Sequence, residues 1–436
     1  RGRPGGDCLW TGCIPSKTLI ASARVAHHMR TADRFGIAAV EPEVDTTRVW
    51  GRIRAVQEAI AATDDSPERI AALGVELVAG DARLTGPHTL AAGGRVLEAR
   101  HILLATGSRP AVPEVEGLRE AGHLTSETVF TLDRAPESVV VIGGGPVGIE
   151  MAQAVRRLGI PVTVLQRGPR ILPRDEPDLV EILGRVLRDE GVEVVCGADV
   201  RRVDVDGGRR VVHATVDGRP RSWAADAILV ATGRRPHVEG LGLEDVGVAV
   251  GPHGVTVDAR MRTSVPSIRC AGDLTGRELF THAAASQAVR AIRDIFFPGR
   301  PGRAAPIPWC TFTDPELAHL GSTVAEASAA HGGAVEVHRH DLAHSDRARC
   351  DGATEGAIVI VTARGRVVGA HILAPAAGEM IAELTLAVSR GLKLTELGSV
   401  VHVYPTLSTG IAQLGGGAAY ARARRLRWLV RGRRRM

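Results

Sequence analysis

The chain has 436 residues, which is enough for two or three domains of ordinary size. Its composition, with 44% hydrophobic and 24% charged residues, is typical of a soluble globular protein, and the absence of an apolar run of about 18 residues argues against a membrane span. The net charge of +5 comes from residues 421–436, which hold eight arginines and no acidic residue; subtracting these eight charges from +5 leaves a net charge of −3 for the rest of the chain. We therefore expect a solvated basic tail and no nucleic-acid partner. We also expect a cytoplasmic protein.

The first elements expected along the chain are helical. Residues 13–29 follow a helical pattern, with Pro15 in the opening turn, where proline is tolerated. A second long helical pattern runs over residues 46–72. Residues 101–107, His-Ile-Leu-Leu-Ala-Thr-Gly, then predict a buried strand that runs into a turn.

A βαβ unit follows Pro136. Residues 138–142 predict a short apolar strand, 143–148 a glycine-rich loop, the stretch up to Leu158 a helix, and 162–165 a second strand. Residues 228–233 end in Ala-Thr-Gly, as residues 102–107 do. The repeated strand end indicates two related nucleotide-binding domains.

The last third of the chain predicts a separate α+β domain. The segment Pro298-Gly-Arg-Pro-Gly has the composition of a linker. Residues 357–373 predict strands and turns, and residues 377–390 predict a helix. Apolar strands therefore alternate with helices over much of the chain, which favours an α/β architecture.

Two cysteines, Cys8 and Cys13, lie close together, whereas the other four are widely separated and are expected to be small buried residues. A disulfide needs Cα atoms within about 7 Å, and Gly12 permits the turn that this requires. Cys13 stands at an expected helix start, where the helix dipole stabilises a thiolate. Taken alone, the spacing fits a redox pair, half of a metal site or two unrelated thiols.

The whole segment, Gly5-Gly-Asp-Cys-Leu-Trp-Thr-Gly-Cys-Ile-Pro-Ser-Lys17, resembles the redox motif of the pyridine nucleotide-disulfide oxidoreductase family. That family includes dihydrolipoamide dehydrogenase, glutathione reductase and mercuric reductase. The resemblance implies that Cys8 is the interchange thiol that meets the substrate and that Cys13 lies against the flavin. It also implies that Lys17, one of only two lysines, lies near the reactive flavin nitrogen and pairs with Glu150.

A second motif predicts the nicotinamide site. Gly143, Gly145 and Gly148 form G-x-G-x-x-G between a strand and a helix, the context in which this motif binds a pyrophosphate at a helix N-terminus. The next strand ends in Gln166 and Arg167, where an NAD site would place an acidic residue. An arginine there favours a 2′-phosphate, so we expect NADPH rather than NADH.

Residues 263–273 resemble the family's second flavin motif. The resemblance implies that the FAD site contains Thr106 and Gly107 of the first Ala-Thr-Gly loop and residues of this motif, with Asp273 bonded to the ribityl chain. The expected cofactor-binding residues beyond the nicotinamide loop are Lys17, Ala82, Thr106, Gly107, Gly233, Gly272, Asp273 and His282. The whole stretch 279–282 is expected to line the flavin.

The resemblance implies the fold as well: two Rossmann-like nucleotide-binding domains, for FAD and NAD(P), and a C-terminal α+β dimerisation domain. The expected boundaries are 1–135 with 257–300, 136–256, 304–420, and the tail 421–436. Family members carry one further βαβ unit, with its own glycine loop, before the redox motif. We therefore expect that the chain is a fragment or has a misassigned start, and that it binds FAD poorly as written.

The closing motif, Val401-His-Val-Tyr-Pro-Thr-Leu-Ser408, departs from the family pattern. Glutathione reductase and dihydrolipoamide dehydrogenase have a histidine acid/base at the position of Tyr404 in this chain. In this family the closing motif serves the active site of the partner subunit, so the resemblance implies that Tyr404 acts across a homodimer. A tyrosine with a pKa near 10 is a poor base at neutral pH, so Tyr404 is expected to donate a hydrogen bond, and His402 is a second candidate.

The expected activity is that of an NAD(P)H-dependent flavoprotein that reduces a metal ion, a disulfide or a quinone-like acceptor through Cys8 and Cys13. Kinship with mercuric reductase is favoured, and no resident metal site is expected. The alternatives are a dihydrolipoamide dehydrogenase and a flavin-free protein that binds nucleotide or dimerises.

Overall fold

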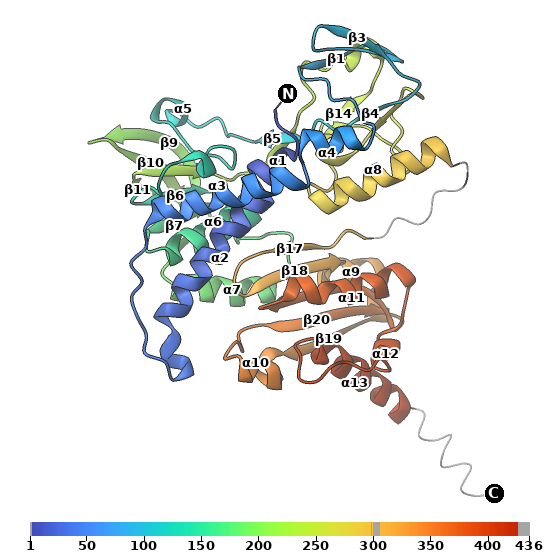
Figure 1. Ribbon diagram of the computed structural model, residues 1–436. Helices are drawn as coiled ribbons and strands as arrows, with labels where there is room; N and C mark the ends of the chain where they lie inside the picture. Colours follow the sequence, from blue (N-terminus) through green and yellow to red (C-terminus); the bar gives the residue numbers. More distant parts are fainter. Residues whose placement is uncertain (1, 298, 300–305, 426–436) are drawn as a thin grey trace, which may run out of the picture. The chain divides into compact units, whose positions relative to one another are not determined.

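The computed structural model describes residues 2–297, 299 and 306–425 (Figure 1). Apart from Gly299, the expected linker at 298–302 lies outside the described residues, as does the basic tail beyond Arg425. The chain divides into two compact units. The first comprises Arg1–Ala23, Glu43–Arg167 and Val195–Arg303, and the second comprises Arg24–Pro42, Gly168–Val194 and Ala304–Met436. Within the described residues, no helix is both long and apolar enough to cross a membrane.

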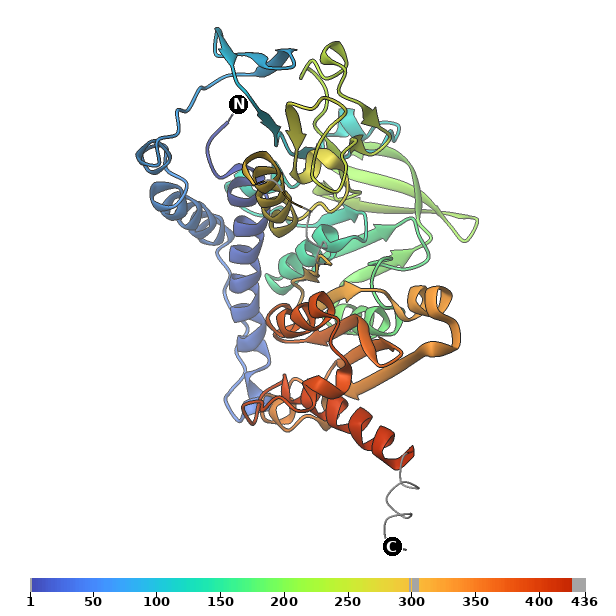
Figure 2. The ribbon, with the colours of Figure 1, turned by 90° about the vertical axis from the view of Figure 1, so that its right-hand side faces the viewer.

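The N-terminal segment is helical, as expected. The helices are α1 (Gly6–Trp10), α2 (Cys13–Arg30), α3 (Thr46–Thr63) and α4 (Pro67–Ala72). Figure 2 shows α2 as one continuous dark-blue helix. The expectation of a single helix over 46–72 is wrong. Ser66 caps α4 by accepting a hydrogen bond from Arg69 N, and Pro67 has no N–H with which to continue α3.

The predicted βαβ unit forms the centre of a parallel sheet in the first unit. The strands are β6 (Val139–Ile142), β7 (Val162–Gln166), β8 (Glu193–Cys196) and β12 (Ala227–Val230), in the order β12-β6-β7-β8. Helix α6 (Pro146–Arg157) connects β6 to β7. Strands β12, β6 and β7 run parallel, and every residue of β6 and β12 is buried, which explains their uninterrupted apolar sequence.

Smaller sheets complete the first unit. Two antiparallel meanders are formed by β1 (Ala82–Gly86), β2 (Thr89–Ala92) and β3 (Arg95–Glu98), and by β9 (Asp199–Asp206), β10 (Arg209–Val216) and β11 (Arg219–Ala225). The predicted strand at 101–107 is β4 (Ile102–Leu104), which pairs in parallel with β16 (Ile268–Cys270). The remaining elements are β5 (Ser108–Pro110), β13 (Arg234–Pro236), β14 (Val250–Gly251), β15 (Gly254–Val255), α5 (Leu118–Ala121) and α8 (Thr281–Phe296).

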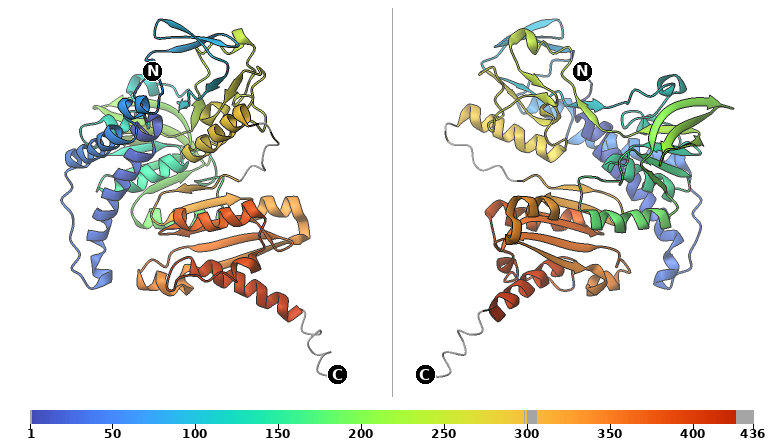
Figure 3. Two further views of the ribbon diagram at one scale, coloured as in Figure 1. Left: turned by 45° about the vertical axis from the view of Figure 1, so that its right-hand side comes forward. Right: turned by 180° about the vertical axis from the view of Figure 1, so that it is seen from behind.

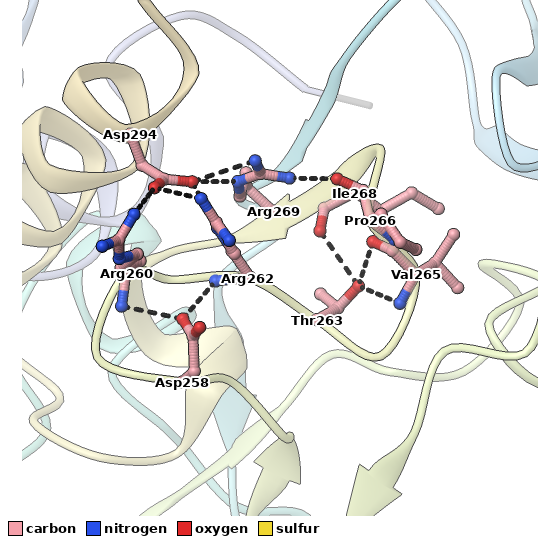
Figure 4. A network of polar contacts seen from close by, with 9 residues as sticks. All are labelled: Asp258, Arg260, Arg262, Thr263, Val265, Pro266, Ile268, Arg269 and Asp294. Atoms are coloured by element: carbon pink, nitrogen blue, oxygen red, sulfur yellow. Dashed lines mark hydrogen bonds and ion pairs between the residues drawn. The ribbon is translucent and has the colours of Figure 1, made fainter. Parts of the chain in front are cut away.

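A buried ion-pair network fastens α8 to the chain before it. The side chain of Asp294 is only 4% exposed and binds the guanidinium groups of Arg260, Arg262 and Arg269 (Figure 4). The hydrogen bonds from Arg262 above all lower the pKa of Asp294 to about 2. Because one carboxylate neutralises charge on three converging arginines, its loss would remove an ion-pair partner from each, and the side chain of Arg269 is only 6% exposed.

The second unit contains a five-stranded antiparallel sheet. Its strands are β17 (Trp309–Thr311), β18 (Glu316–Gly321), β19 (Val335–Asp341), β20 (Ala357–Ala363) and β21 (Arg366–Ala374), in the order β17-β18-β21-β20-β19. The expected strands at 357–373 are thus β20 and β21, and the expected helix is α11 (Ala377–Arg390). The other helices are α7 (Pro177–Asp189), α9 (Val324–His331), α10 (Asp346–Cys350), α12 (Leu394–Leu397) and α13 (Thr409–Arg425).

The sheet of the second unit is covered by α11 (Figure 3). Leu320 of β18 and Ile372 of β21 belong to the same apolar core as Met380 and Leu384 of α11. Side chains alternate along a strand, so His319 points to the opposite face of the sheet from Leu320. The core is built almost wholly from aliphatic residues, in keeping with the 3% aromatic content.

Candidate functional site

The two cysteines of the redox motif lie on consecutive helices. Cys8 is in α1, Cys13 is the first residue of α2, and both are half-buried free thiols. Gly12 does not have a positive φ. Its role is close approach instead, because a Cβ at this position would lie 3.0 Å from the carbonyl oxygen of Asp7. The chain thus turns back on itself between the cysteines, and a larger residue at this position would crowd the Asp7 carbonyl.

The surroundings of Cys13 stabilise its thiolate. The pKa of Cys13 is lowered to about 6, chiefly by a hydrogen bond from the Cys8 thiol, with further contributions from Thr281 and Lys17. Thr281 Oγ1, at the start of α8, lies 3.6 Å from Cys13 Sγ. Donating to Cys13 and burial both raise the pKa of Cys8. The reduced pair is therefore a thiol at Cys8 beside a thiolate at Cys13.

A buried glutamine holds the redox loop in place. Gln57 of α3 donates from Nε2 to the carbonyl oxygens of Leu9 and Trp10, at 3.0 and 2.8 Å. Only 5% of Gln57 is exposed. Since both carbonyls lie between Cys8 and Cys13, α3 fixes the backbone that separates the two sulfur atoms.

Lys17 and Glu150 form an ion pair, with Nζ 2.8 Å from Oε2. Lys17 lies one turn after Cys13 on α2, and its side chain is 36% exposed, whereas that of Glu150 on α6 is 7% exposed. The ammonium group contributes to the low pKa of Cys13. The pair therefore joins the redox helix to the helix that follows the glycine loop.

The glycine loop after β6 has the shape that a pyrophosphate requires. Gly143 has a φ of 116°, and a Cβ on Gly148 would clash with the Gly143 carbonyl, so α6 packs directly on the turn. A Cβ on Gly145 would meet nothing within 4 Å, and no side chain caps α6 at this residue. No side chain therefore occupies the start of α6, which suits the close approach of a dinucleotide pyrophosphate.

The residues at the end of β7 have different surroundings. Gln166 Oε1 accepts a hydrogen bond from Gly144 N at 2.9 Å, so its side chain braces the glycine loop. Arg167 is exposed. An exposed guanidinium beside this loop fits the expected preference for a 2′-phosphate.

The two Ala-Thr-Gly loops lie side by side. Strand β5 follows Gly107, strand β13 follows Gly233, and they pair antiparallel with Arg234 opposite Pro110. Thr106 Oγ1 donates to the carbonyl oxygen of His237. The turns at Gly107 and Gly233 both have positive φ and open space where a Cβ would point. The similarity seen in the sequence thus corresponds to two adjacent turns.

The second flavin motif meets these loops at Asp273. Asp273 Oδ2 accepts a hydrogen bond from Ser108 Oγ at 2.5 Å and lies 3.6 Å from Arg234 Nε. Gly272, with a φ of 75°, donates its N–H to buried Gln287. These polar groups fit a ribityl chain, whose hydroxyls Asp273 would hold.

Two further residues predicted for the flavin site lie at the surface. Ala82 is exposed, begins β1 and pairs with Ala92 in the meander. His282 is exposed near the start of α8, and its ring stacks on that of Phe280 with centroids 5.5 Å apart. Their roles toward the cofactor stay predictions.

Tyr404 and His402 belong to the second unit and have separate partners. Tyr404, which is 68% exposed, donates from its hydroxyl to Asp346 at 2.9 Å, and this bond raises its pKa. His402 Nε2 lies 3.0 Å from both carboxylate oxygens of Glu383, and Nδ1 lies 3.0 Å from the carbonyl oxygen of Val400. Although burial opposes it, these acceptors raise the pKa of His402. Both ring nitrogens of His402 are thus engaged with acceptors of the protein itself.

The other cysteines only partly match the expectation of buried residues. Cys270 is buried and burial raises its pKa to about 12, Cys196 and Cys310 are half-buried, and Cys350 is exposed at the end of α10. The prediction for Cys350 is therefore wrong, because α10 is a short surface helix. Across the described ranges, no group of three or more His, Cys, Asp or Glu side chains has the arrangement of a metal site.

Sequence reasoning missed three residues that shape this site: Gln57, Ser108 and Arg234. Their contacts join positions more than 40 residues apart, and no local pattern distinguishes them from ordinary surface residues. Thr281 lies within the stretch 279–282 that was expected to line the flavin. Its position at the start of a helix was the signal available for its contact with Cys13.

Comparison with known proteins agrees with this geometry. Residues 3–288 match the model of the pyridine nucleotide-disulphide oxidoreductase family, and residues 307–414 match its dimerisation domain. A mercuric reductase from Streptomyces lividans is 36% identical over 84% of this chain and 78% of its own length. A dihydrolipoyl dehydrogenase from Chlorobaculum tepidum is 34% identical over 94% of this chain and 88% of its own length.

A solved structure is similar over almost the whole chain. The Cu(II) complex of the HOCl-induced flavoprotein disulfide reductase RclA from Escherichia coli has a TM-score of 0.82 and 26% identity, covering 95% of this chain and 91% of that one. The predicted fold class, with two nucleotide-binding domains and a dimerisation domain, is thereby confirmed. The chain belongs to the pyridine nucleotide-disulphide oxidoreductase family and is an FAD-dependent, NAD(P)H-using disulfide oxidoreductase.

Proposed function

We propose that this enzyme passes electrons from NADPH through Cys8 and Cys13 to a thiophilic metal ion such as Hg(II) or Cu(II). The observation that carries the proposal is the state of the closing motif. Tyr404 donates a hydrogen bond to Asp346, and both ring nitrogens of His402 face acceptors of the chain itself. Both side chains are therefore engaged within the protein and are not directed at a substrate thiol.

This matters because the acceptor classes differ in their need for a proton. Reduction of a disulfide by a thiolate expels a second thiolate, which a general acid protonates. Reduction of a thiol-bound metal ion expels no such group. For a two-electron acceptor such as Hg(II), the Cys8–Cys13 disulfide forms, the metal gains two electrons, and the thiol proton passes to solvent. The arrangement therefore favours a metal ion over a dithiol substrate.

The site residues of the first unit have separate roles in this proposal. Cys8 meets the acceptor as the interchange thiol, while Cys13 is held as a thiolate by Thr281 and Lys17. Bound FAD supplies two-electron relay chemistry between the nicotinamide and the dithiol. The glycine loop at 143–148 orients the dinucleotide, and Arg167 selects the 2′-phosphate of NADPH.

The dimerisation-domain match supports a homodimer. We place Tyr404 in the site of the partner subunit, where its hydroxyl would face the acceptor. A dithiol that is kept reduced by NADPH suits a compartment with reduced thiols, so we assign the enzyme to the cytoplasm. Two of the similar proteins support a metal acceptor, since one is named a mercuric reductase and another is a Cu(II) complex, whereas a third relative is named a dihydrolipoyl dehydrogenase.

The test is NADPH oxidation by the purified dimer with Hg(II), Cu(II), oxidised lipoamide, glutathione disulfide or a quinone as acceptor. We expect turnover with the metal ions, and its loss in Cys8→Ser. Turnover with lipoamide alone would assign the chain to the dihydrolipoamide dehydrogenases. Quinone reduction that persists in Cys8→Ser would show that electrons leave the flavin directly, and would overturn the role of the dithiol.

A further inference from the structure

The residue before the interchange thiol is held by contacts that the proposed mechanism does not use. Asp7 accepts hydrogen bonds from Thr11 at two places: its carbonyl oxygen from Thr11 N at 2.9 Å, and its Oδ1 from Thr11 Oγ1. A Cβ on Gly12 would lie 3.2 Å from Asp7 Oδ2. The carboxylate therefore folds against the loop that separates Cys8 from Cys13.

The same carboxylate is anchored from outside the loop. Arg234 Nη2 lies 3.3 Å from Asp7 Oδ1. Arg234 Nε donates to Ser108 Oγ at 2.7 Å and lies 3.6 Å from Asp273 Oδ2. The Arg234 side chain is 17% exposed and that of Asp7 is 44% exposed. One guanidinium thus serves two carboxylates, and a net negative charge remains beside the redox loop.

The charge of the redox pair itself changes on reduction. Written in full, the disulfide takes up two electrons and one proton and becomes a thiol at Cys8 and a thiolate at Cys13. The oxidised pair is neutral and the reduced pair is an anion. A nearby carboxylate therefore destabilises the reduced form relative to the disulfide. In agreement, the charge of Asp7 raises the pKa of both cysteines.

The loop contacts act in the same direction. By tying residue 11 back to residue 7, Asp7 holds the two free thiols in a turn that is already closed, so that forming the disulfide orders less of the chain than it would from a flexible loop. We propose that Asp7 is a positioning residue that lowers the reduction potential of the Cys8–Cys13 pair, through its charge and through its bonds to Thr11. The reduced pair is thereby a stronger electron donor toward the acceptor.

The inference rests on the proposed function only in treating Cys8 and Cys13 as the working pair. Its test uses no acceptor: the full-length protein is equilibrated in dithiothreitol redox buffers, quenched with an alkylating agent, and the Cys8–Cys13 peptide is quantified by mass spectrometry. We expect Asp7→Asn, which keeps an oxygen for Thr11 but removes the charge, to raise the equilibrium constant for reduction by about two- to tenfold. A tenfold change corresponds to about 30 mV.

Three further variants separate charge from structure. Thr11→Val removes the bond to Asp7 Oδ1 but keeps the charge, so it should raise the equilibrium constant without lowering the pKa of Cys13. Arg234→Gln should lower the equilibrium constant, opposite to Asp7→Asn, whereas two merely structural lesions would act alike. Asp64→Asn changes an exposed carboxylate of the same unit and should have no effect.

The outcomes are distinct from those of the acceptor assay. If Asp7→Asn leaves both the equilibrium constant and the pKa of Cys13 unchanged in a variant with a native melting curve, the tuning role is wrong, even if metal ions are reduced. If both shift as expected while no metal ion is reduced, the tuning role stands and the proposed acceptor fails.

Discussion

Cys13 Sγ lies 3.6 Å from Thr281 Oγ1, so the first residue of α2 faces the first residue of α8. Both positions are helix N-termini, where the positive ends of two dipoles stabilise an anion. The contact joins segments 268 residues apart. The contact adds to the hydrogen bond from Cys8, which is the main cause of the low pKa of Cys13.

Replacing Thr281 with Val should raise the pKa of Cys13 from about 6. Valine has nearly the shape of threonine but lacks the hydroxyl group that donates a hydrogen bond to the thiolate. A hydrogen bond to a charged group is worth about 1.5–3 kcal/mol, or roughly one to two pKa units. The pH dependence of alkylation at Cys13 measures the change. Thr281→Ser keeps the hydroxyl and should alkylate like the parent; equal pKa values in the parent and Thr281→Val would contradict the account.

Removing the ammonium group of Lys17 should lower the free energy of unfolding, because Glu150 then loses its ion pair with Lys17. Lys17→Met removes an ion-pair partner from a carboxylate whose side chain is 7% exposed, which should cost about 2 kcal/mol after allowance for the partly exposed lysine. The double variant Lys17→Met/Glu150→Gln should recover most of this loss. Urea unfolding of the four proteins gives the coupling energy, and strictly additive losses would refute a functional pair.

Arg167 should decide the choice of nicotinamide cofactor. Arg167→Glu places a carboxylate where the 2′-phosphate is expected and should lower kcat/KM for NADPH relative to NADH by about tenfold or more. The ratio of the two kcat/KM values is the measurement. Arg185→Glu makes the same charge change on the surface of α7 and should leave the ratio unaltered. A parent enzyme that already prefers NADH would show the assignment to be wrong.

Asp294 should govern part of the acid stability of the protein. Its folded pKa of about 2 lies below the ordinary 3.8, so its contribution is fully present above pH 4 and is lost as the pH falls toward 2. That contribution is about 2 kcal/mol by the size of the shift. Asp294→Asn should be destabilised at pH 7 and should lose less further stability between pH 4 and 2 than the parent does. Parallel unfolding curves across that range would exclude the network as the cause.

Much of this arrangement could be predicted from the sequence because local patterns carry it. Residues 377–390 form the expected helix α11, and the glycine loop follows β6 as its spacing requires. The break between α3 and α4 was missed although Ser66 and Pro67 mark a helix start. The apolar periodicity continued across them and outweighed the capping signal.

The contacts that tune the redox pair could not be predicted in this way. Gln57 and Arg234 act on the loop at 7–13 from distant positions, and each is a polar residue whose partner lies far along the chain. Only the assembled fold brings them together. Their identity therefore depends on tertiary geometry, whereas Cys8 and Cys13 are recognisable from their spacing and flanking residues alone.

The central claim is that electrons from NADPH reach the Cys8–Cys13 pair. The most direct measurement is an anaerobic titration of the FAD-loaded enzyme with NADPH, with the absorption spectrum recorded and new thiols counted by alkylation at each step. The account predicts two new thiols per chain, at Cys8 and Cys13, together with a long-wavelength band from the Cys13 thiolate against the flavin. Bleaching of the flavin with no new thiol at either cysteine would contradict it.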